Sequence, residues 1–218
     1  MRHAPGRRGA RLAWPVLCFL AVFASGCLTL TSTLRPDGSG TIDLRYRLPE
    51  EATVATEKAR FTSPHFTLAD VTVDTVKKEA HVKGTLDEAT KLSSVPFFKN
   101  VAVTRTQEGD ESQLTFVVTQ EKPIELPPGQ PGPDITLTLP GPVTAAEPKA
   151  NAETNGDTVR WRFPLDEFAR AKTTTLVVRW KGAAEAKPEA KPEANSDDTA
   201  EPAAKPNADA TPPTPAAP

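Results

Sequence analysis

The stretch LTLTSTLRPDGSGTIDLRYRL, residues 28–48, decides the fold of this chain. Apolar and polar side chains alternate on both sides of a central Pro36-Asp37-Gly38 step, and a period of two sends alternate residues to opposite faces of a strand. Proline presets one backbone angle and glycine accepts a positive φ, so the central step predicts a turn. Residues 28–48 therefore predict a β-hairpin with one apolar face and one polar face.

Similar alternation continues through the following residues. It predicts strands over residues 66–76, 79–86, 101–105, 113–119, 135–139, 159–163 and 175–180. Short helices are predicted after Pro49, after the capping-box pattern Thr85-Leu86-Asp87-Glu88 and after Pro164. Because hairpins dominate and no long crossover helix is predicted, we expect an α+β domain. It would be a curved, mostly antiparallel sheet built from hairpins, with two or three short helices on one face.

Composition divides the 218 residues into three parts. Residues 1–26 form a signal segment, residues 27–182 hold the predicted strands, and residues 183–218 are rich in Pro, Ala and Glu. The last part has too little apolar surface to offset its ordering entropy, so we expect a disordered, extended tail. One domain of about 155 residues remains, which is long enough for a sizeable core.

The N-terminal segment has the layout of a secretory signal. Several arginines and no acid precede an apolar run from Leu12 to Phe23, and small residues then lead to Cys27. The step Ser25-Gly26-Cys27 looks like the end of a bacterial lipoprotein signal, which is cut just before the cysteine. We expect cleavage after Gly26 and a lipid anchor, with palmitate-type chains, on the sulfur of Cys27.

Two alternatives for this segment stay open. An uncleaved membrane anchor needs about 20 apolar residues, which is longer than this run. Ordinary secretory cleavage near Ala24 or Gly26 leaves Cys27 unmodified. The lipoprotein interpretation predicts a location in the cell membrane or the outer membrane, with the domain facing the periplasm or the cell exterior.

Charge and cysteine content narrow the function further. The 26 Lys and Arg residues nearly balance the 28 Asp and Glu residues, whereas a nucleic-acid-binding surface needs a clear basic surplus. One of the two cysteines, Cys18, lies in the signal and the other is Cys27. The domain therefore has no disulfide and depends on apolar packing for its stability.

Residues for catalysis or metal binding are sparse. His65 and His81 are isolated from each other and from cysteine, so a structural zinc site lacks ligands. The chain has no glycine-rich phosphate loop and no Gly-x-Ser-x-Gly nucleophile motif. We expect no catalytic residue, no metal site and no cofactor, and hence a protein that is not an enzyme.

Three segments of the chain resemble a known family. The start, residues 26–48, and the distal segments 135–143 and 155–161 resemble LppM-type bacterial lipoprotein domains. The resemblance covers residues 27–182 and implies an α+β envelope domain with an apolar cavity that holds a lipid or glycolipid. Members often continue into a membrane helix after the last strand, whereas this chain continues into its Pro/Ala/Glu-rich tail.

Two functions remain as hypotheses. The first is a module that binds a lipid or another apolar ligand in a cleft between sheet and helices. The candidate wall residues of that cleft are Tyr46, Phe61, Phe97, Phe98, Trp161 and Trp180. The second is a non-catalytic structural or interaction lipoprotein with a filled core, whose faces and tail contact other envelope proteins.

Overall fold

A computed structural model describes residues 28–48 and 52–182, and the following elements belong to those residues. The elements in chain order are β1 (Leu28–Leu34), β2 (Gly40–Arg47), α2 (Val54–Arg60), β3 (Phe66–Asp74), β4 (Glu79–Leu86), η1 (Ala89–Ser94), η2 (Pro96–Phe98), β5 (Val101–Glu108), β6 (Glu111–Thr119), β7 (Pro131–Thr138), β8 (Val143–Glu147), η3 (Lys149–Asn151), β9 (Ala152–Asn155), β10 (Thr158–Pro164), α3 (Leu165–Arg170) and β11 (Thr173–Lys181). The elements labelled η are 3₁₀-helices. No helix in this described part is both long and apolar enough to cross a membrane.

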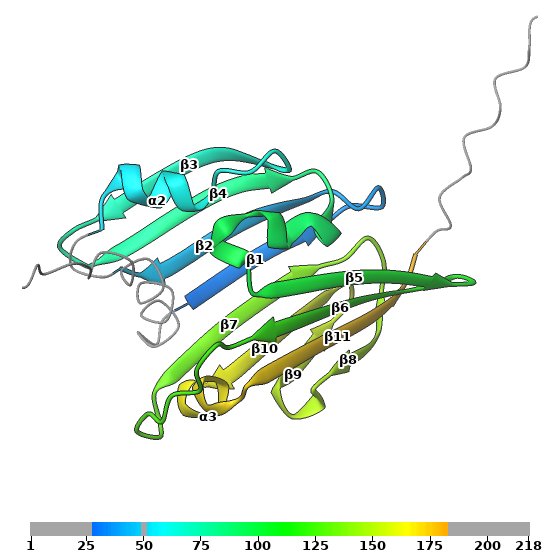
Figure 1. Ribbon diagram of the computed structural model, residues 1–218. Helices are drawn as coiled ribbons and strands as arrows, with labels where there is room; N and C mark the ends of the chain where they lie inside the picture. The colour runs from blue at the N-terminus through cyan, green and yellow to red at the C-terminus, as the bar shows by residue number, and fades with distance from the viewer. Residues whose placement is uncertain (1–27, 49–51, 183–218) are drawn as a thin grey trace, which may run out of the picture. The chain divides into compact units, whose positions relative to one another are not determined.

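The strands form two sheets, and Figure 1 shows both. The large sheet has the order β3-β4-β2-β1-β7-β10-β9, and the small sheet has the order β5-β6-β11-β8. All the strand pairs are antiparallel except β1 and β7, which are parallel. The expected α+β class is therefore correct, but the expected single sheet is wrong because the strands divide between two.

The stretch that opens the domain pairs as its alternation indicates. β1 and β2 are antiparallel, with Leu28 opposite Tyr46 and Leu34 opposite Gly40. The turn between them places Gly38 at φ 87°, and the Asp37 carboxylate accepts a hydrogen bond from the Ser39 N–H at 2.9 Å. The leucines of β1 face the interior and the threonines between them are exposed, as a period of two requires.

The short helices differ in detail from their predictions. α2 begins at Val54 because Thr53 and Thr56 form a capping box there, whereas the predicted start at Pro49 lies outside the described residues. The helix predicted at the Thr85-Leu86-Asp87-Glu88 pattern begins at Ala89 as the 3₁₀-helix η1. The capping box itself is wrong, because Thr85 belongs to β4 and the N-cap Glu88 makes no side-chain capping hydrogen bond. Pro96 opens the next 3₁₀-helix, η2. α3 follows Pro164 as expected.

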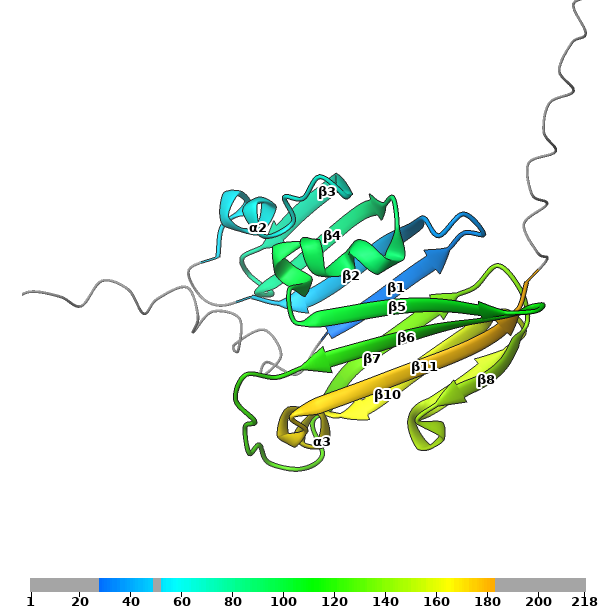
Figure 2. The ribbon, with the colours of Figure 1, turned by 45° about the vertical axis from the view of Figure 1, so that its right-hand side comes forward.

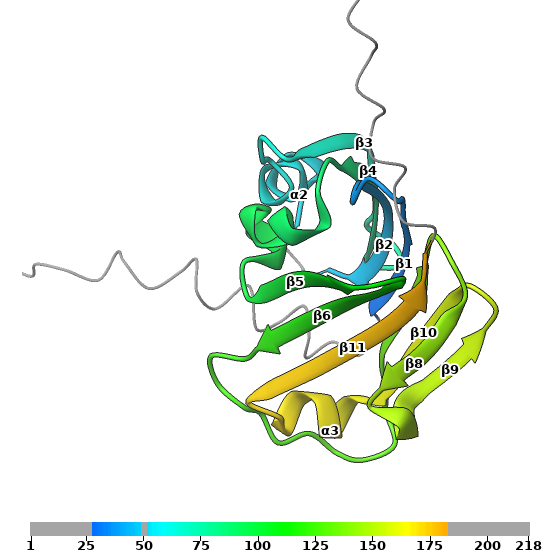
Figure 3. The same cartoon turned by 90° about the vertical axis from the view of Figure 1, so that its right-hand side faces the viewer.

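Two layers cover the inner face of the large sheet. Figure 3 shows α2, η1 and η2 on the concave side of β2, β3 and β4, and the small sheet next to them. The largest fully buried side chains come from both regions and include Trp161, Trp180, Tyr46, Phe61 and Phe97. The core is therefore continuous across the two layers.

The domain has two ends, which we call proximal and distal. At the proximal end β1 and β7 begin, because they pair in parallel, and β10 ends. At the distal end β11 finishes, and the Gly182 N–H donates to the Asp110 carbonyl in the β5–β6 turn. Arg105 near that turn donates to the Pro36 carbonyl of the β1–β2 turn. The described residues thus start and finish at opposite ends (Figure 2).

Candidate functional site: an apolar cavity between the sheets

A cavity of about 100 Å³ lies between the large and small sheets. All four inward side chains of β1 line it: Leu28, Leu30, Ser32 and Leu34. Because a strand rises about 3.3 Å per residue, these side chains span roughly 20 Å. The cavity therefore follows the length of β1 from the proximal to the distal end.

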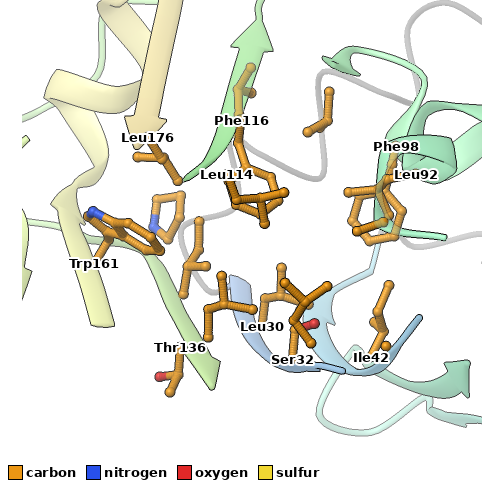
Figure 4. A pocket seen from close by; sticks show the side chains of 18 of the residues that line it. Leu30, Ser32, Ile42, Leu92, Phe98, Leu114, Phe116, Thr136, Trp161 and Leu176 are labelled. Atoms are coloured by element: carbon orange, nitrogen blue, oxygen red, sulfur yellow. The ribbon is translucent and has the colours of Figure 1, made fainter. Parts of the chain in front are cut away.

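The other walls come from elements far apart in the sequence. Figure 4 shows Leu114 and Phe116 of β6 facing Leu30 and Ser32 across the space. The remaining side chains that close the cavity include Ile42, Leu86, Leu92, Phe98, Val101, Val118, Ile135, Leu137, Trp161, Phe168 and Leu176. Strands of both sheets, η1, η2 and α3 thus all contribute to one apolar enclosure.

The chemistry of these walls is that of hydrocarbon. None of the described residues that line the cavity is charged, and the hydroxyl residues among them are Ser32 and Thr136. Its serine, Ser32, donates from Oγ to the Thr41 carbonyl at 2.8 Å, so this hydroxyl is already satisfied by the sheet. No buried side-chain nitrogen or oxygen in residues 28–48 and 52–182 lacks a hydrogen-bond partner. A polar ligand group placed here would lose its hydration without compensation, whereas an apolar one would not.

The burial of the walls indicates open space rather than filled core. Leu30, Phe116 and Ile135 come from central strands, yet each is only partly buried. For comparison, an engineered cavity of about 150 Å³ lined by Leu, Ile and Phe stays dry and binds benzene. The space in this protein is similar in size to a slender apolar group such as part of one hydrocarbon chain. A lipid with two chains would require the walls to move outward.

Trp161 of β10 gives the cavity a spectroscopic probe. Its indole N–H donates to the Glu147 carbonyl at 3.1 Å, and this bond fixes the orientation of the ring. The side chain is fully buried and lines the cavity. A ligand in the cavity therefore has to lie within energy-transfer distance of this tryptophan.

Two of the six predicted wall residues, Phe98 and Trp161, line the cavity. Phe97 and Phe98 follow Pro96 directly and are both buried, but only Phe98 reaches the cavity. The structure places the other four predicted residues elsewhere in the core: Tyr46, Phe61, Phe97 and Trp180.

Tyr46, Phe61 and Phe97 belong to a filled aromatic cluster beneath α2. The Phe97 ring centroid lies 4.9 Å from that of Tyr46 and 4.8 Å from that of Phe61. The Tyr46 hydroxyl donates to the buried carboxylate of Glu57, and Arg60 pairs with the same carboxylate at 3.1 Å. Burial, together with the hydrogen bond to Glu57, raises the pKa of Tyr46 far above its usual range. These contacts fix α2 to the sheet, and the three rings belong to this cluster and not to the lining of the cavity.

Trp180 of β11 is also fully buried, near the distal end. The guanidinium of Arg105 lies 5.8 Å from its ring centroid, which is a cation–π distance. The same arginine contacts the β1–β2 turn, so Trp180 helps to join the two sheets at this end. Its function in the structure is therefore packing.

The outer face of the large sheet is polar. His81 lies there with a ring nitrogen 2.7 Å from Asp43, and Asp134 accepts a hydrogen bond from Arg160 Nε at 2.7 Å. The hydrogen bonds from Arg160, partly opposed by burial, hold the pKa of Asp134 below its ordinary value. Within residues 28–48 and 52–182, no group of three His, Cys, Asp or Glu side chains is arranged to hold a metal ion.

Most of the cavity walls were not identified from sequence. The alternation marked Leu28, Leu30 and Leu34 as inward, but it could not show which inward residues pack tightly and which face open space. Ser32 carried one usable signal, because it is a small polar residue at an inward position between leucines. Such a position leaves volume unfilled.

The predicted cleavage at Gly26, the lipidation at Cys27 and the tail of residues 183–218 all lie outside the described residues. No protein-family model, curated protein or solved structure matches this chain.

Proposed function

We propose that this chain is a lipid-anchored bacterial envelope protein whose domain binds the hydrocarbon chain of a lipid in the cavity between its two sheets. In this proposal the domain is non-catalytic and belongs to the LppM type. The anchor is carried by Cys27 after cleavage at Gly26. The domain faces the periplasm or the cell exterior from the cell membrane or the outer membrane.

The observation that carries the proposal is the uncharged, apolar lining of the cavity. Binding sites for apolar ligands are concave and mostly hydrophobic, and this cavity has those properties. The curved large sheet supports the proposal, because the short helices and the small sheet cover its concave side without filling the space along β1. The basic, apolar and Ser25-Gly26-Cys27 pattern of the N-terminus supports the anchor.

The test uses delipidated mature protein and cis-parinaric acid, a straight-chain fatty acid whose polyene fluoresces in apolar surroundings. The proposal predicts saturable uptake with energy transfer from tryptophan, because Trp161 lines the cavity. The test variant is Leu114→Trp, which narrows the cavity. The matched control is Gln113→Trp, which changes the neighbouring residue of β6 that does not line the cavity. Uptake lost in the first variant and retained in the second supports the proposal, and equal uptake by both opposes it.

A second function is favoured by the filled aromatic cluster and by the small size of the cavity. In this alternative the domain is a structural or interaction lipoprotein, and residues 183–218 reach other envelope proteins. Wild-type protein that takes up no apolar probe, together with a tail deletion that folds normally but loses co-purifying envelope proteins, would favour this alternative.

A further inference from the structure

The proximal end of the domain carries a second hollow beside the cavity. It is an open groove bordered by the start of β7, by η3 and by the end of β10, and its lining includes Gln130, Ala150 and Arg162. Leu28 and Pro133 line both the groove and the cavity. The two hollows therefore adjoin at these two residues.

The groove is electrically balanced. Arg162 is the basic residue of its lining, and the guanidinium lies 3.6 Å from Asp134 and 3.2 Å from Glu153. Gly132 forms part of the lining with backbone alone, since a Cβ there would lie 2.5 Å from the Phe163 carbonyl oxygen. A groove without net charge suits the passage of an uncharged chain better than the retention of a charged head group.

The position of Leu28 ties the groove to the N-terminus. β1 begins at Leu28, directly after Cys27, so a lipid on Cys27 would hold the proximal end against a bilayer. This step rests on the proposed function. β11 ends at the distal end, so that end would lie away from the anchor.

The β3–β4 turn provides an independent indication for the same end. Tyr46 pairs with both Leu28 and Ala80, so the turn that precedes Ala80 lies at the proximal end. Val76 in this turn is 91% exposed, the higher of the two values among exposed large hydrophobic residues in the described part. Its neighbour Lys77 carries a largely exposed ammonium 3.8 Å from Asp74. An exposed apolar side chain beside a lysine suits a membrane interface.

We infer that the groove at the proximal end is the entrance of the cavity, and that it faces the bilayer. Through it the hydrocarbon chain of a membrane lipid passes between Leu28 and Pro133 into the space along β1. The ligand then comes from the membrane that anchors the protein, and diffusion through water is not required.

The experiment uses the lipidated full chain in phosphatidylcholine and phosphatidylglycerol vesicles that contain cis-parinaric acid. Ala150→Cys places a single label site in the groove, and Thr106→Cys places one on an exposed residue of β5 close to the distal β5–β6 turn as the matched control. A bulky maleimide at 150 should slow uptake and release by the same factor, about tenfold for each 1.4 kcal/mol added to the barrier of passage. Because only the entrance is obstructed, the Kd should not change. The label at 106 should change neither rate.

A second measurement reports the orientation. A small fluorophore at 150 should be quenched by spin-labelled lipid head groups, and the same fluorophore at 106, near the distal end, should not be. Two results would overturn the entrance and leave the proposed function intact. One is normal uptake by wild-type protein with unchanged rates in the labelled Ala150→Cys variant, and the other is equal quenching at the two sites. Absence of uptake by unlabelled wild-type protein would overturn both the entrance and the proposed function.

Discussion

Replacing Ser32 by leucine tests whether the space along β1 is a real cavity. Ser32 faces Leu114 and Phe116 across the open volume, so a leucine side chain at this position can extend into it (Figure 4). The neighbouring Thr31 points to the exposed face of the same strand. Thr31→Leu therefore adds the same side chain on the outside and serves as the control.

The expected change in stability follows from the size of the cavity. An unfilled cavity costs about 24 cal/mol per Å³, so the space of about 100 Å³ sets an upper limit of about 2.4 kcal/mol for the gain. Burying the extra carbons should stabilise the folded state by about 2 kcal/mol. Loss of the Ser32 hydrogen bond to the Thr41 carbonyl should destabilise it by about 1 kcal/mol. The net gain is about 1 kcal/mol, which raises Tm by roughly 2–4 °C.

The assay combines urea unfolding of delipidated protein with uptake of cis-parinaric acid. We expect Ser32→Leu to be more stable than wild type and to lose the probe, because the same volume cannot hold both. Thr31→Leu should stay within about 0.5 kcal/mol of wild type and bind normally. A Ser32→Leu protein that is clearly destabilised and still binds the probe would refute the reasoning.

Three further changes examine other parts of the structure. Tyr46→Phe leaves the buried carboxylate of Glu57 with one hydrogen-bond partner fewer, so we expect urea unfolding to show a stability lower by about 1–3 kcal/mol. The affinity for cis-parinaric acid should not change, because Tyr46 does not line the cavity, and an altered affinity would contradict the separation of the aromatic cluster from the cavity. Gly84→Ala would place a Cβ 2.2 Å from the Phe66 ring, so we expect about 1–3 kcal/mol of destabilisation, whereas Thr85→Ala on the exposed side of β4 should have little effect. The pKa of Asp134 is lowered in the folded state, so its stabilisation is present above the unfolded pKa of about 3.9 and is lost as the pH falls through the folded pKa. Asp134→Asn should therefore be about 1 kcal/mol less stable than wild type at pH 7, with the difference shrinking below about pH 4; a difference independent of pH would argue against the Arg160 pairing.

Local features of the fold were predictable because they depend on neighbouring residues. The alternation over residues 28–48 gave the β1–β2 pair, and the pattern over 79–86 gave β4 with its observed bounds. The turn at Asn155-Gly156-Asp157 joins β9 to β10, as its glycine at positive φ allows.

The division into two sheets was not predictable by the same means. β6 and β11 are far apart in the chain, as are β1 and β7, and nothing in their alternation specifies the partner strand. The cavity depends on that pairing, since its walls combine β1, β6, β7, β10 and β11. Choosing aromatic residues as its walls failed for Tyr46 and Trp180 because large rings fill space well. Most of the walls are instead aliphatic, and the small Ser32 and the aromatic Phe98, Phe116, Trp161 and Phe168 also belong to them.

Native mass spectrometry of the protein extracted from membranes in mild detergent is the most direct test. We predict a mature chain that starts at a lipid-modified Cys27 and carries one additional lipid, which dissociates when the protein unfolds and is missing from the Ser32→Leu variant. An uncut leader, or wild-type protein that carries no more lipid than this variant, would contradict the account.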